Sequence, residues 1–195
     1  MTRRRLKPEE RRDELLDIGA EFFAAKPYDA VLMEEIAERA GVSRALVYRY
    51  FPAKRDLFAA IYQRAAERLV AQTEATPARS LDELVRTGLD AHLDYFAANR
   101  LTVLAANRTL AGDPVIQAII NDELTTLRAD LLDASGLSGG RRETGSATMR
   151  SWLVFVREMC LSWLENDAIS RDDVRDICHR ALLGALAALS GVDRT

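Results

Sequence analysis

Residues able to perform acid–base, nucleophilic or metal chemistry are few and scattered in this sequence of 195 residues. Its two histidines, His92 and His179, occur in no HExxH or Glu-x-x-His pattern, and neither a glycine-rich phosphate loop nor a Ser/His/Asp grouping is present. The two cysteines, Cys160 and Cys178, lack the spacing of zinc ligands, so we expect buried, reduced thiols. We therefore expect no catalytic residue, no metal site and no cofactor.

Basic and aromatic side chains recur at helical spacing in one short segment, and they indicate a different chemistry. Arg44, Tyr48 and Arg49 stand at i, i+4 and i+5, so a helix would carry them on one face. An arginine there can pair bidentately with guanine, and a tyrosine can reach a phosphate or a thymine methyl group. Lys54, at the start of the following helix, can hold a phosphate. The pattern predicts a surface that binds DNA.

The residues around this segment are typical of a helix-turn-helix. We expect a short helix over 33–40 and a second over 44–51, joined by a turn. Ala40 and Gly41 are small enough to let two helices cross steeply, and Ser43 can cap the second helix. A glycine-turned helix pair can also be a packing motif without any ligand. Outward arginines and tyrosines favour the binding interpretation.

The rest of the chain is also predicted to be helical. Apolar residues recur every three or four positions nearly throughout, and no alternating run of β-branched residues indicates a strand. The sequence therefore predicts an all-α protein of about nine helices. The segment SGLSGGRRETGS, at 135–146, is expected to be its most mobile loop. The expected helices span 8–26, 33–40, 44–51, 54–74, 81–99, 101–110, 114–133, 147–165 and 170–190, with TPARS at 76–80 as a connection.

The segment IAERAGVSRALVYRYFPAKRDLF, within residues 11–58, resembles the signature of the TetR/AcrR family of transcriptional regulators. The resemblance implies an N-terminal three-helix DNA-binding domain over 1–55, with its helix-turn-helix at about 33–52. A long fourth helix would join it to an α-helical domain, 56–195, that binds an effector and dimerises. One position departs from the family pattern, because Leu32 stands where Ser or Thr usually caps the second helix. Asp29 could cap one turn earlier, or the cap could be lost at a cost of about 1 kcal/mol.

The resemblance also implies which side chains meet DNA. The third helix would enter the major groove, with Arg44 and Arg49 reading bases while Tyr48 and Lys54 hold phosphates. The family's contact positions fall on Arg44, Ala45, Leu46, Tyr48, Arg49, Tyr50 and Lys54.

The last two helices are candidates for a homodimer interface. Residues 147–165 are apolar on nearly every side, and residues 170–190 carry a stripe of small and apolar residues that permits close approach. The family resemblance implies a four-helix bundle formed by two helices from each subunit. The same residues could instead be the core of a monomer, although a two-fold operator favours a two-fold protein.

An effector cavity would lie among the middle helices. Its aromatic lining would suit a small hydrophobic or aromatic effector, although aromatic residues at helical spacing are commonly ordinary core. The candidate lining residues are His92, Tyr95, Phe96, Asn107, Trp152, Phe155, Met159 and Trp163.

These features predict a regulator that binds a palindromic operator and is released by its effector. Repression is the expected direction, and activation is the alternative. Two other classes remain open at this point: a helical interaction scaffold that does not bind DNA, and a small helical enzyme. Steep salt dependence of binding would distinguish DNA recognition from the scaffold.

The N-terminus and composition bear on location. The start of the chain is basic, with Arg3, Arg4 and Arg5 able to reach a phosphate backbone, but it has no apolar signal segment. No run approaches the roughly 18 apolar residues of a membrane span. A cytoplasmic protein without a membrane partner is expected.

Overall fold

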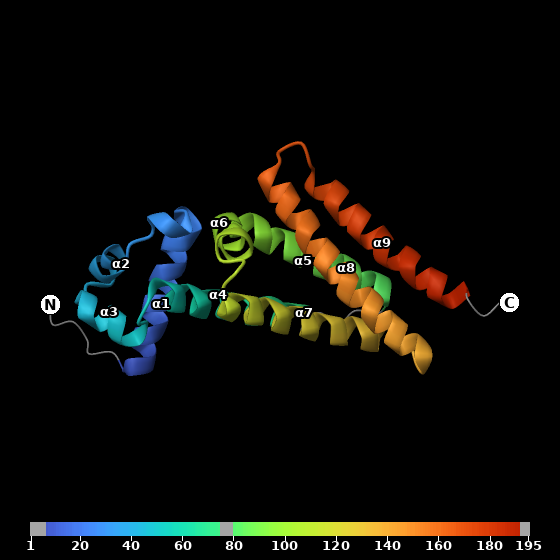
Figure 1. Ribbon diagram of the computed structural model, residues 1–195, viewed down its shortest axis with the longest axis horizontal. Coiled ribbons are helices and arrows are strands. Elements are labelled where there is room, and N and C mark those ends of the chain that lie inside the picture. The colour runs from blue at the N-terminus through green and yellow to red at the C-terminus, as the bar shows by residue number, and fades with distance from the viewer. Residues whose placement is uncertain (1–6, 75–79, 192–195) are drawn as a thin grey trace. The chain divides into compact units, whose positions relative to one another are not determined.

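The computed structural model describes residues 7–74 and 80–191. These residues form α-helices and no strand, which confirms the all-α prediction (Figure 1). The basic residues Arg3 to Arg5 and most of the predicted connection at 76–80 lie outside the described residues. Within the described ranges, no helix is long and apolar enough to cross a membrane. The helices are α1 Pro8–Ala25, α2 Met33–Ala40, α3 Arg44–Tyr50, α4 Lys54–Glu74, α5 Leu81–Ala98, α6 Arg100–Leu104, α7 Pro114–Ala134, α8 Gly140–Glu165 and α9 Arg171–Gly191, with a 3-10 turn at Tyr28–Ala30 and a π-helical turn at Ala105–Thr109.

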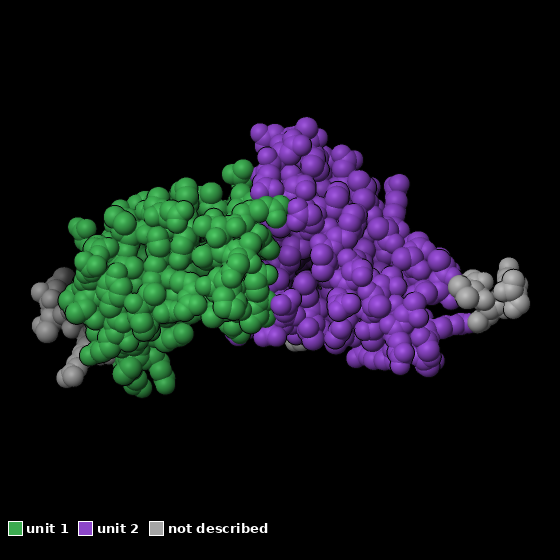
Figure 2. All heavy atoms as spheres, viewed as in Figure 1, with its two compact units in different colours: residues 1–65, 99–119 green, residues 66–98, 120–195 purple. Residues whose placement is uncertain are grey.

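The chain forms two compact units, and their division differs from the expected boundary after residue 55. Unit 1 contains residues 1–65 and 99–119, and unit 2 contains residues 66–98 and 120–195 (Figure 2). The helix α6 therefore belongs with the N-terminal helices, where it packs against α1. Both α4 and α7 begin in unit 1 and continue into unit 2.

An aromatic cluster forms the core of unit 1. Phe58 from α4 meets Phe23 from α1 edge to face at 5.0 Å and meets Tyr28 edge to face at 5.3 Å. Tyr62, one turn along α4, stacks on Phe58 at 6.2 Å. Burial of large rings and their offset or edge contacts both stabilise such a core. The cluster joins α1 and the turn at Tyr28–Ala30 to α4, and α2 of the helix-turn-helix packs against α1.

The uncapped start of the second helix is visible in the structure. Helix α2 begins at Met33, and Leu32 occupies the cap position without a side-chain hydrogen bond. The Glu35 carboxylate accepts a hydrogen bond from the Leu32 backbone instead, and the ammonium of Lys26 lies 2.7 Å from it. The hydrogen bond from Lys26 is the main reason that the pKa of Glu35 is lowered. The backbone amide of Leu32 thus has its acceptor in the Glu35 side chain of the same helix, which is one half of a capping box.

Unit 2 is built on the packing of α5, α8 and α9 (Figure 1). The indole Nε1 of Trp152 on α8 donates a hydrogen bond of 2.7 Å to the carbonyl oxygen of Cys178 on α9. His179 on α9 lies 2.8 Å from the Asp82 carboxylate of α5. Cys160 and Cys178 are both buried and free, as predicted, and burial raises the pKa of each thiol to about 12. Both thiols are therefore protonated and chemically quiet near neutral pH.

The predicted loop at 135–146 is wrong in its second half, because α8 already begins at Gly140. Only 135–139 connects the helices, with Gly136 and Gly139 at positive φ. The start of α8 is held by contacts to the preceding connection and to the end of α7, which composition does not reveal. The Arg142 guanidinium lies 2.6 Å from the Asp133 carboxylate of α7, and the Leu137 side chain packs directly over Gly145.

Candidate DNA-binding surface and effector cavity

A left-handed glycine sets the angle between α2 and α3. Gly41 has φ 57° and ψ 41°, and the amide of Val42 donates back to the Ala37 carbonyl at 3.0 Å, which closes α2 with a Schellman-type turn. The Ser43 side chain then accepts a hydrogen bond of 3.2 Å from the Leu46 amide and so caps α3. Val47 is the buried residue of α3, and its burial anchors the helix against the core. The opposite face of α3 is left to solvent.

The exposed face of α3 carries the predicted basic and aromatic residues. Arg44, Ala45 and Arg49 are exposed, whereas Leu46, Tyr48 and Tyr50 are half-buried. The guanidinium of Arg44 lies over the Tyr48 ring at 5.2 Å, and that of Arg49 lies over the Tyr50 ring at 5.8 Å. Each arginine is thus aligned by the tyrosine nearest to it.

An acidic residue of α2 holds Arg44. The Arg44 Nε lies 2.8 Å from the Glu34 carboxylate. A hydrogen bond to the Tyr48 side chain and the charge of Glu34 raise the pKa of Arg44, which keeps it fully protonated. An exchange of Glu34 for an acceptor on DNA would leave the arginine charged and already oriented.

Lys54 is engaged within the protein. Its ammonium donates to the carbonyl oxygens of Tyr28 at 2.9 Å, Asp29 at 3.3 Å and Val31 at 3.1 Å. It also lies 4.6 Å from the centre of the Tyr28 ring. An ammonium has three protons to donate, and three carbonyls receive them here. In this structure Lys54 therefore closes the turn at 28–31, and a phosphate would have to displace a carbonyl to reach it.

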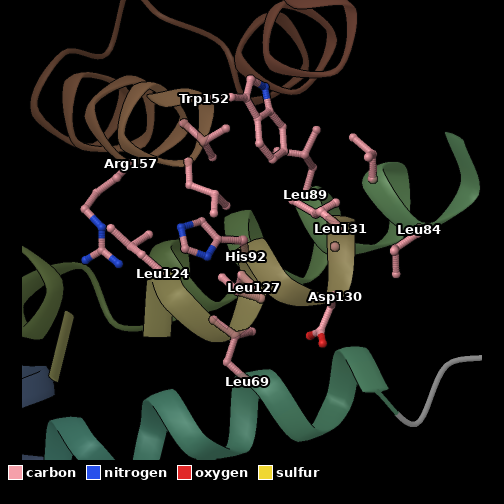
Figure 3. A pocket seen from close by; sticks show the side chains of 14 residues that line it. Leu69, Leu84, Leu89, His92, Leu124, Leu127, Asp130, Leu131, Trp152 and Arg157 are labelled. Carbon is pink, nitrogen blue, oxygen red and sulfur yellow. The ribbon is translucent and has the colours of Figure 1, made fainter. Parts of the chain in front are cut away.

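Unit 2 contains an apolar cavity between four helices (Figure 3). The space open to the centre of a water molecule inside it is about 60 Å³. Most of its wall is leucine and valine, and its polar side chains are His92, Asp130, Trp152 and Arg157. The wall is formed by Leu69 of α4, by Leu84, Val85, Gly88, Leu89 and His92 of α5, by Leu124, Leu127, Asp130 and Leu131 of α7, and by Trp152, Leu153, Val156 and Arg157 of α8.

Two of the eight residues expected to line an effector cavity, His92 and Trp152, belong to this wall. Phe96 is core beneath His92, with ring centres 4.1 Å apart, and Phe155 is exposed on α8. The others, Tyr95, Asn107, Met159 and Trp163, do not line the cavity either; Asn107 lies in unit 1 and donates to the Val103 carbonyl at 2.9 Å. The leucines of the wall and Gly88 were not predicted, because no local pattern separates a leucine that faces a cavity from one that faces a core.

The polar end of the cavity combines a neutral imidazole with a buried ion pair. Burial lowers the pKa of His92 to about 4, so the ring is uncharged near neutral pH. Its buried Nε2 has no hydrogen-bond partner among the described residues. The Arg157 Nη2 donates to the Glu123 carboxylate at 2.9 Å, and both side chains are buried. A ligand that enters this end meets a hydrogen-bonding group rather than a free charge.

The described residues hold no group of three or more side chains arranged to bind a metal ion.

Comparisons with known proteins agree with this arrangement. Residues 15–61 match the family described as "Bacterial regulatory proteins, tetR family". The chain is 36% identical over 175 residues to the HTH-type transcriptional activator FasR of Mycolicibacterium smegmatis, a match that covers 84% of this chain and 76% of FasR.

Solved structures show the same fold over nearly the whole chain. A tetR-family transcriptional regulator from Streptomyces coelicolor superposes with a TM-score of 0.82 at 24% identity, covering 96% of this chain and 85% of that one. FadR from Bacillus subtilis, solved in complex with stearoyl-CoA, has a TM-score of 0.65 at 16% identity, covering 89% of this chain and 96% of FadR. The family match and the identity to FasR show that this chain belongs to the tetR family and is a DNA-binding transcriptional regulator, not an enzyme.

Proposed function

We propose that the protein is an effector-controlled regulator that reads a palindromic operator with α3. The observation that carries the proposal is the exposed face of α3, on which Arg44 and Arg49 are both aligned by tyrosines directly after the Gly41 turn. Arg44 and Arg49 read base edges, and Ala45 allows the helix backbone to approach the groove. Tyr48 contacts a phosphate. Leu46 and Tyr50 determine how deeply α3 enters the major groove.

Lys54 remains part of the proposed DNA-binding surface, but as a residue that positions other groups instead of one that holds a phosphate. Because its ammonium is bound to three carbonyls, it positions the turn before α2 rather than offering a free charge. A direct phosphate contact would require one of these bonds to be exchanged on binding.

The outer face of α8 and α9 supports a homodimer on a two-fold operator. Ile177 of α9 and Phe155 of α8 are large apolar residues that are exposed in the single chain. Ala181, Gly184 and Ala188 are also exposed and continue the Ile177 face at intervals of three or four residues. Such small residues let two helices approach closely. A second copy of the chain covers this face and brings two copies of α3 to successive major grooves, about 34 Å apart.

The cavity of unit 2 is the proposed effector site. Its wall suits an apolar effector, and binding would reposition α7, which supplies four wall residues. The same helix begins in unit 1, where the Asp113 carboxylate that caps it also lies 3.4 Å from Arg55 at the start of α4. Movement of α7 would therefore shift Asp113 relative to Arg55 and so act on α4, the helix that follows α3. A preference of 1–3 kcal/mol for the DNA-incompetent state suffices to weaken operator binding by about 5- to 150-fold.

Repression is the proposed direction of regulation. The protein bound to its operator would block the promoter, and its release by the effector would allow transcription. Activation is the second candidate, because FasR, the relative at 36% identity, is named an activator. In vitro transcription from a promoter that carries the operator decides between them: added protein lowers transcript yield under repression and raises it under activation.

The first experiment is selection from random duplex DNA with the full chain at two salt concentrations. An enriched inverted repeat, with binding that falls steeply as salt rises, supports the proposal. The absence of enrichment together with salt-independent binding would overturn it and favour a protein-binding scaffold.

A further inference from the structure

The polar side chains in the wall of the unit 2 cavity differ in what they bind. The indole of Trp152 donates a hydrogen bond of 2.7 Å to a backbone carbonyl of α9, and Nη2 of Arg157 donates to Glu123 at 2.9 Å. Asp130 is also engaged within the protein. The buried Nε2 of His92 has no hydrogen-bond partner among the described residues. His92 is therefore the wall residue whose hydrogen-bonding capacity is left to a ligand.

The imidazole of His92 is held in place by apolar contacts. The ring of Phe96 lies 4.1 Å from it, measured between ring centres, at a tilt of 36°. The imidazole belongs to the cavity wall, where Figure 3 shows it among the side chains of Leu124, Leu127 and Arg157. A buried polar atom without a partner is uncommon in folded proteins. A ligand in the cavity can supply that partner.

The surroundings of the imidazole favour an uncharged ligand group. Burial lowers the pKa of His92 to about 4, while the charge of Glu123 raises it and that of Arg157 lowers it. The ring is therefore neutral near neutral pH, and the positive charge of Arg157 is already paired with Glu123. An ionised group brought to this place would leave water without gaining an opposite charge of its own.

A hydroxyl group matches a neutral imidazole. The ring has one N–H that donates and one nitrogen that accepts, and a hydroxyl can do both, so it can bind whichever nitrogen it reaches. A hydrocarbon can do neither. A site with a buried hydrogen-bonding group discriminates against an analogue that lacks the matching group, because the site is then left unpaired. Most of the remaining wall is leucine and valine, which suits an apolar remainder of the ligand.

We propose that His92 selects the effector, and that the effector is an uncharged, apolar molecule with one hydroxyl group, which hydrogen-bonds the imidazole while the hydrocarbon part lies against the leucines of the cavity wall. This inference rests on the proposed effector function of the cavity. It adds the chemical class of the effector and the residue that recognises it.

Three small probes test the inference: phenol, toluene and benzoate. They share one ring and carry a hydroxyl, a methyl or a carboxylate group. Their size suits the cavity, in which about 60 Å³ is open to the centre of a water molecule, room for roughly four to six water-sized spheres. Nuclear magnetic resonance of protein labelled with ¹⁵N-histidine measures the affinities and follows the imidazole directly.

The variants separate recognition from occupation of the cavity. His92→Phe keeps a ring and removes both nitrogens. The matched control is His179→Gln, because His179 is the other histidine of the chain, pairs with Asp82 and does not line the cavity. The same control assigns the ¹⁵N signals of His92. Gly88→Met fills the cavity, since a Cβ at Gly88 has nothing within 4 Å.

We expect phenol to bind the wild type at neutral pH and to shift the ring ¹⁵N signals of His92, and toluene to bind with a much smaller shift. His92→Phe should lower the affinity for phenol about tenfold and leave that for toluene within about twofold. Benzoate should bind at least about tenfold more weakly than phenol. His179→Gln should keep all three affinities, whereas Gly88→Met should weaken phenol and toluene alike.

Two results would overturn the inference while leaving the effector cavity in place. One is benzoate that binds as tightly as phenol, which would indicate a charged effector. The other is His92→Phe that keeps its full affinity for phenol while toluene still binds. If no probe binds the wild type, or if Gly88→Met leaves binding unchanged, the effector function proposed for the cavity fails as well.

Discussion

The guanidinium of Arg44 on α3 and the carboxylate of Glu34 on α2 form an ion pair of 2.8 Å at the exposed face of the helix-turn-helix. Their side chains are 63% and 46% exposed, so the pair contributes little to stability, at most about 1 kcal/mol. Its consequence is for recognition. Glu34 orients Arg44, but it also places a negative charge beside a surface proposed to meet phosphates.

Replacing Glu34 should therefore strengthen DNA binding without changing its selectivity. We expect Glu34→Gln to raise affinity for operator and unrelated DNA alike by about two- to fivefold, because a repulsion is removed.

Arg44→Ala should lower operator affinity and relax the preference at one base step by about 1–3 kcal/mol. Fluorescence anisotropy with operator and single-base variants measures both effects. A loss for Arg44→Ala that is equal on every sequence would contradict a base-reading role.

The contacts of Lys54 predict a stability effect from its replacement. Lys54→Met removes three hydrogen bonds from an ammonium to backbone carbonyls, so we expect the free energy of unfolding to fall by about 2 kcal/mol. Urea denaturation followed by circular dichroism measures it. Arg49→Gln, a loss of one exposed charge on α3, is the control and should leave stability within about 0.5 kcal/mol. Weaker DNA binding by Lys54→Met at unchanged stability would instead show a phosphate contact.

His92 should make the protein less stable in acid. Its pKa in the folded protein is about 4 because burial disfavours the charged ring, against about 6.5 in the unfolded chain. Between these values the unfolded chain binds more protons, so stability is complete above pH 6.5 and falls as the pH drops towards 4, by about 2–3 kcal/mol. Urea denaturation at pH 7, 5.5 and 4.5 should show this fall in the wild type and a shallower one in His92→Gln. Parallel curves for the two proteins would be inconsistent with a buried neutral imidazole.

Two helical glycines should respond oppositely to alanine. A Cβ at Gly88 on α5 meets nothing within 4 Å, so Gly88→Ala should raise stability by about 0.5–1 kcal/mol through helix propensity. A Cβ at Gly19 on α1 would lie 2.8 Å from the Ile61 side chain, so Gly19→Ala should gain nothing or lose stability. Thermal unfolding of both variants gives the comparison. Equal gains would show that α1 and α4 do not pack as closely as the structure indicates.

The pairing of Asp113 with Arg55 should matter for signalling more than for stability. Asp113→Asn keeps an oxygen to cap α7 and removes the charge facing Arg55, so we expect a loss of unfolding free energy below about 1 kcal/mol. Gly88→Met, which fills the cavity, should weaken operator binding, and Asp113→Asn should reduce that effect in a double-mutant cycle. Strictly additive effects on operator affinity would argue against transmission through α7.

Local features of the sequence predicted most of the fold. The bounds of α2 and α4 agree with the expected 33–40 and 54–74, because apolar periodicity and neighbouring glycine or proline residues are signals contained in a short segment. The same holds for the face of α3, since residues spaced by three and four positions share a helix face in any fold.

Other features depend on contacts between different elements, and only the tertiary structure decided them. The start of α8 at Gly140 depends on packing of Leu137 and on a contact to α7. The three carbonyl partners of Lys54 lie more than 20 positions away. The cavity wall is assembled from α4, α5, α7 and α8, so its leucines carry the same local pattern as leucines of the core. A helix face can be read from spacing alone, whereas what that face meets is set by the elements that fold against it.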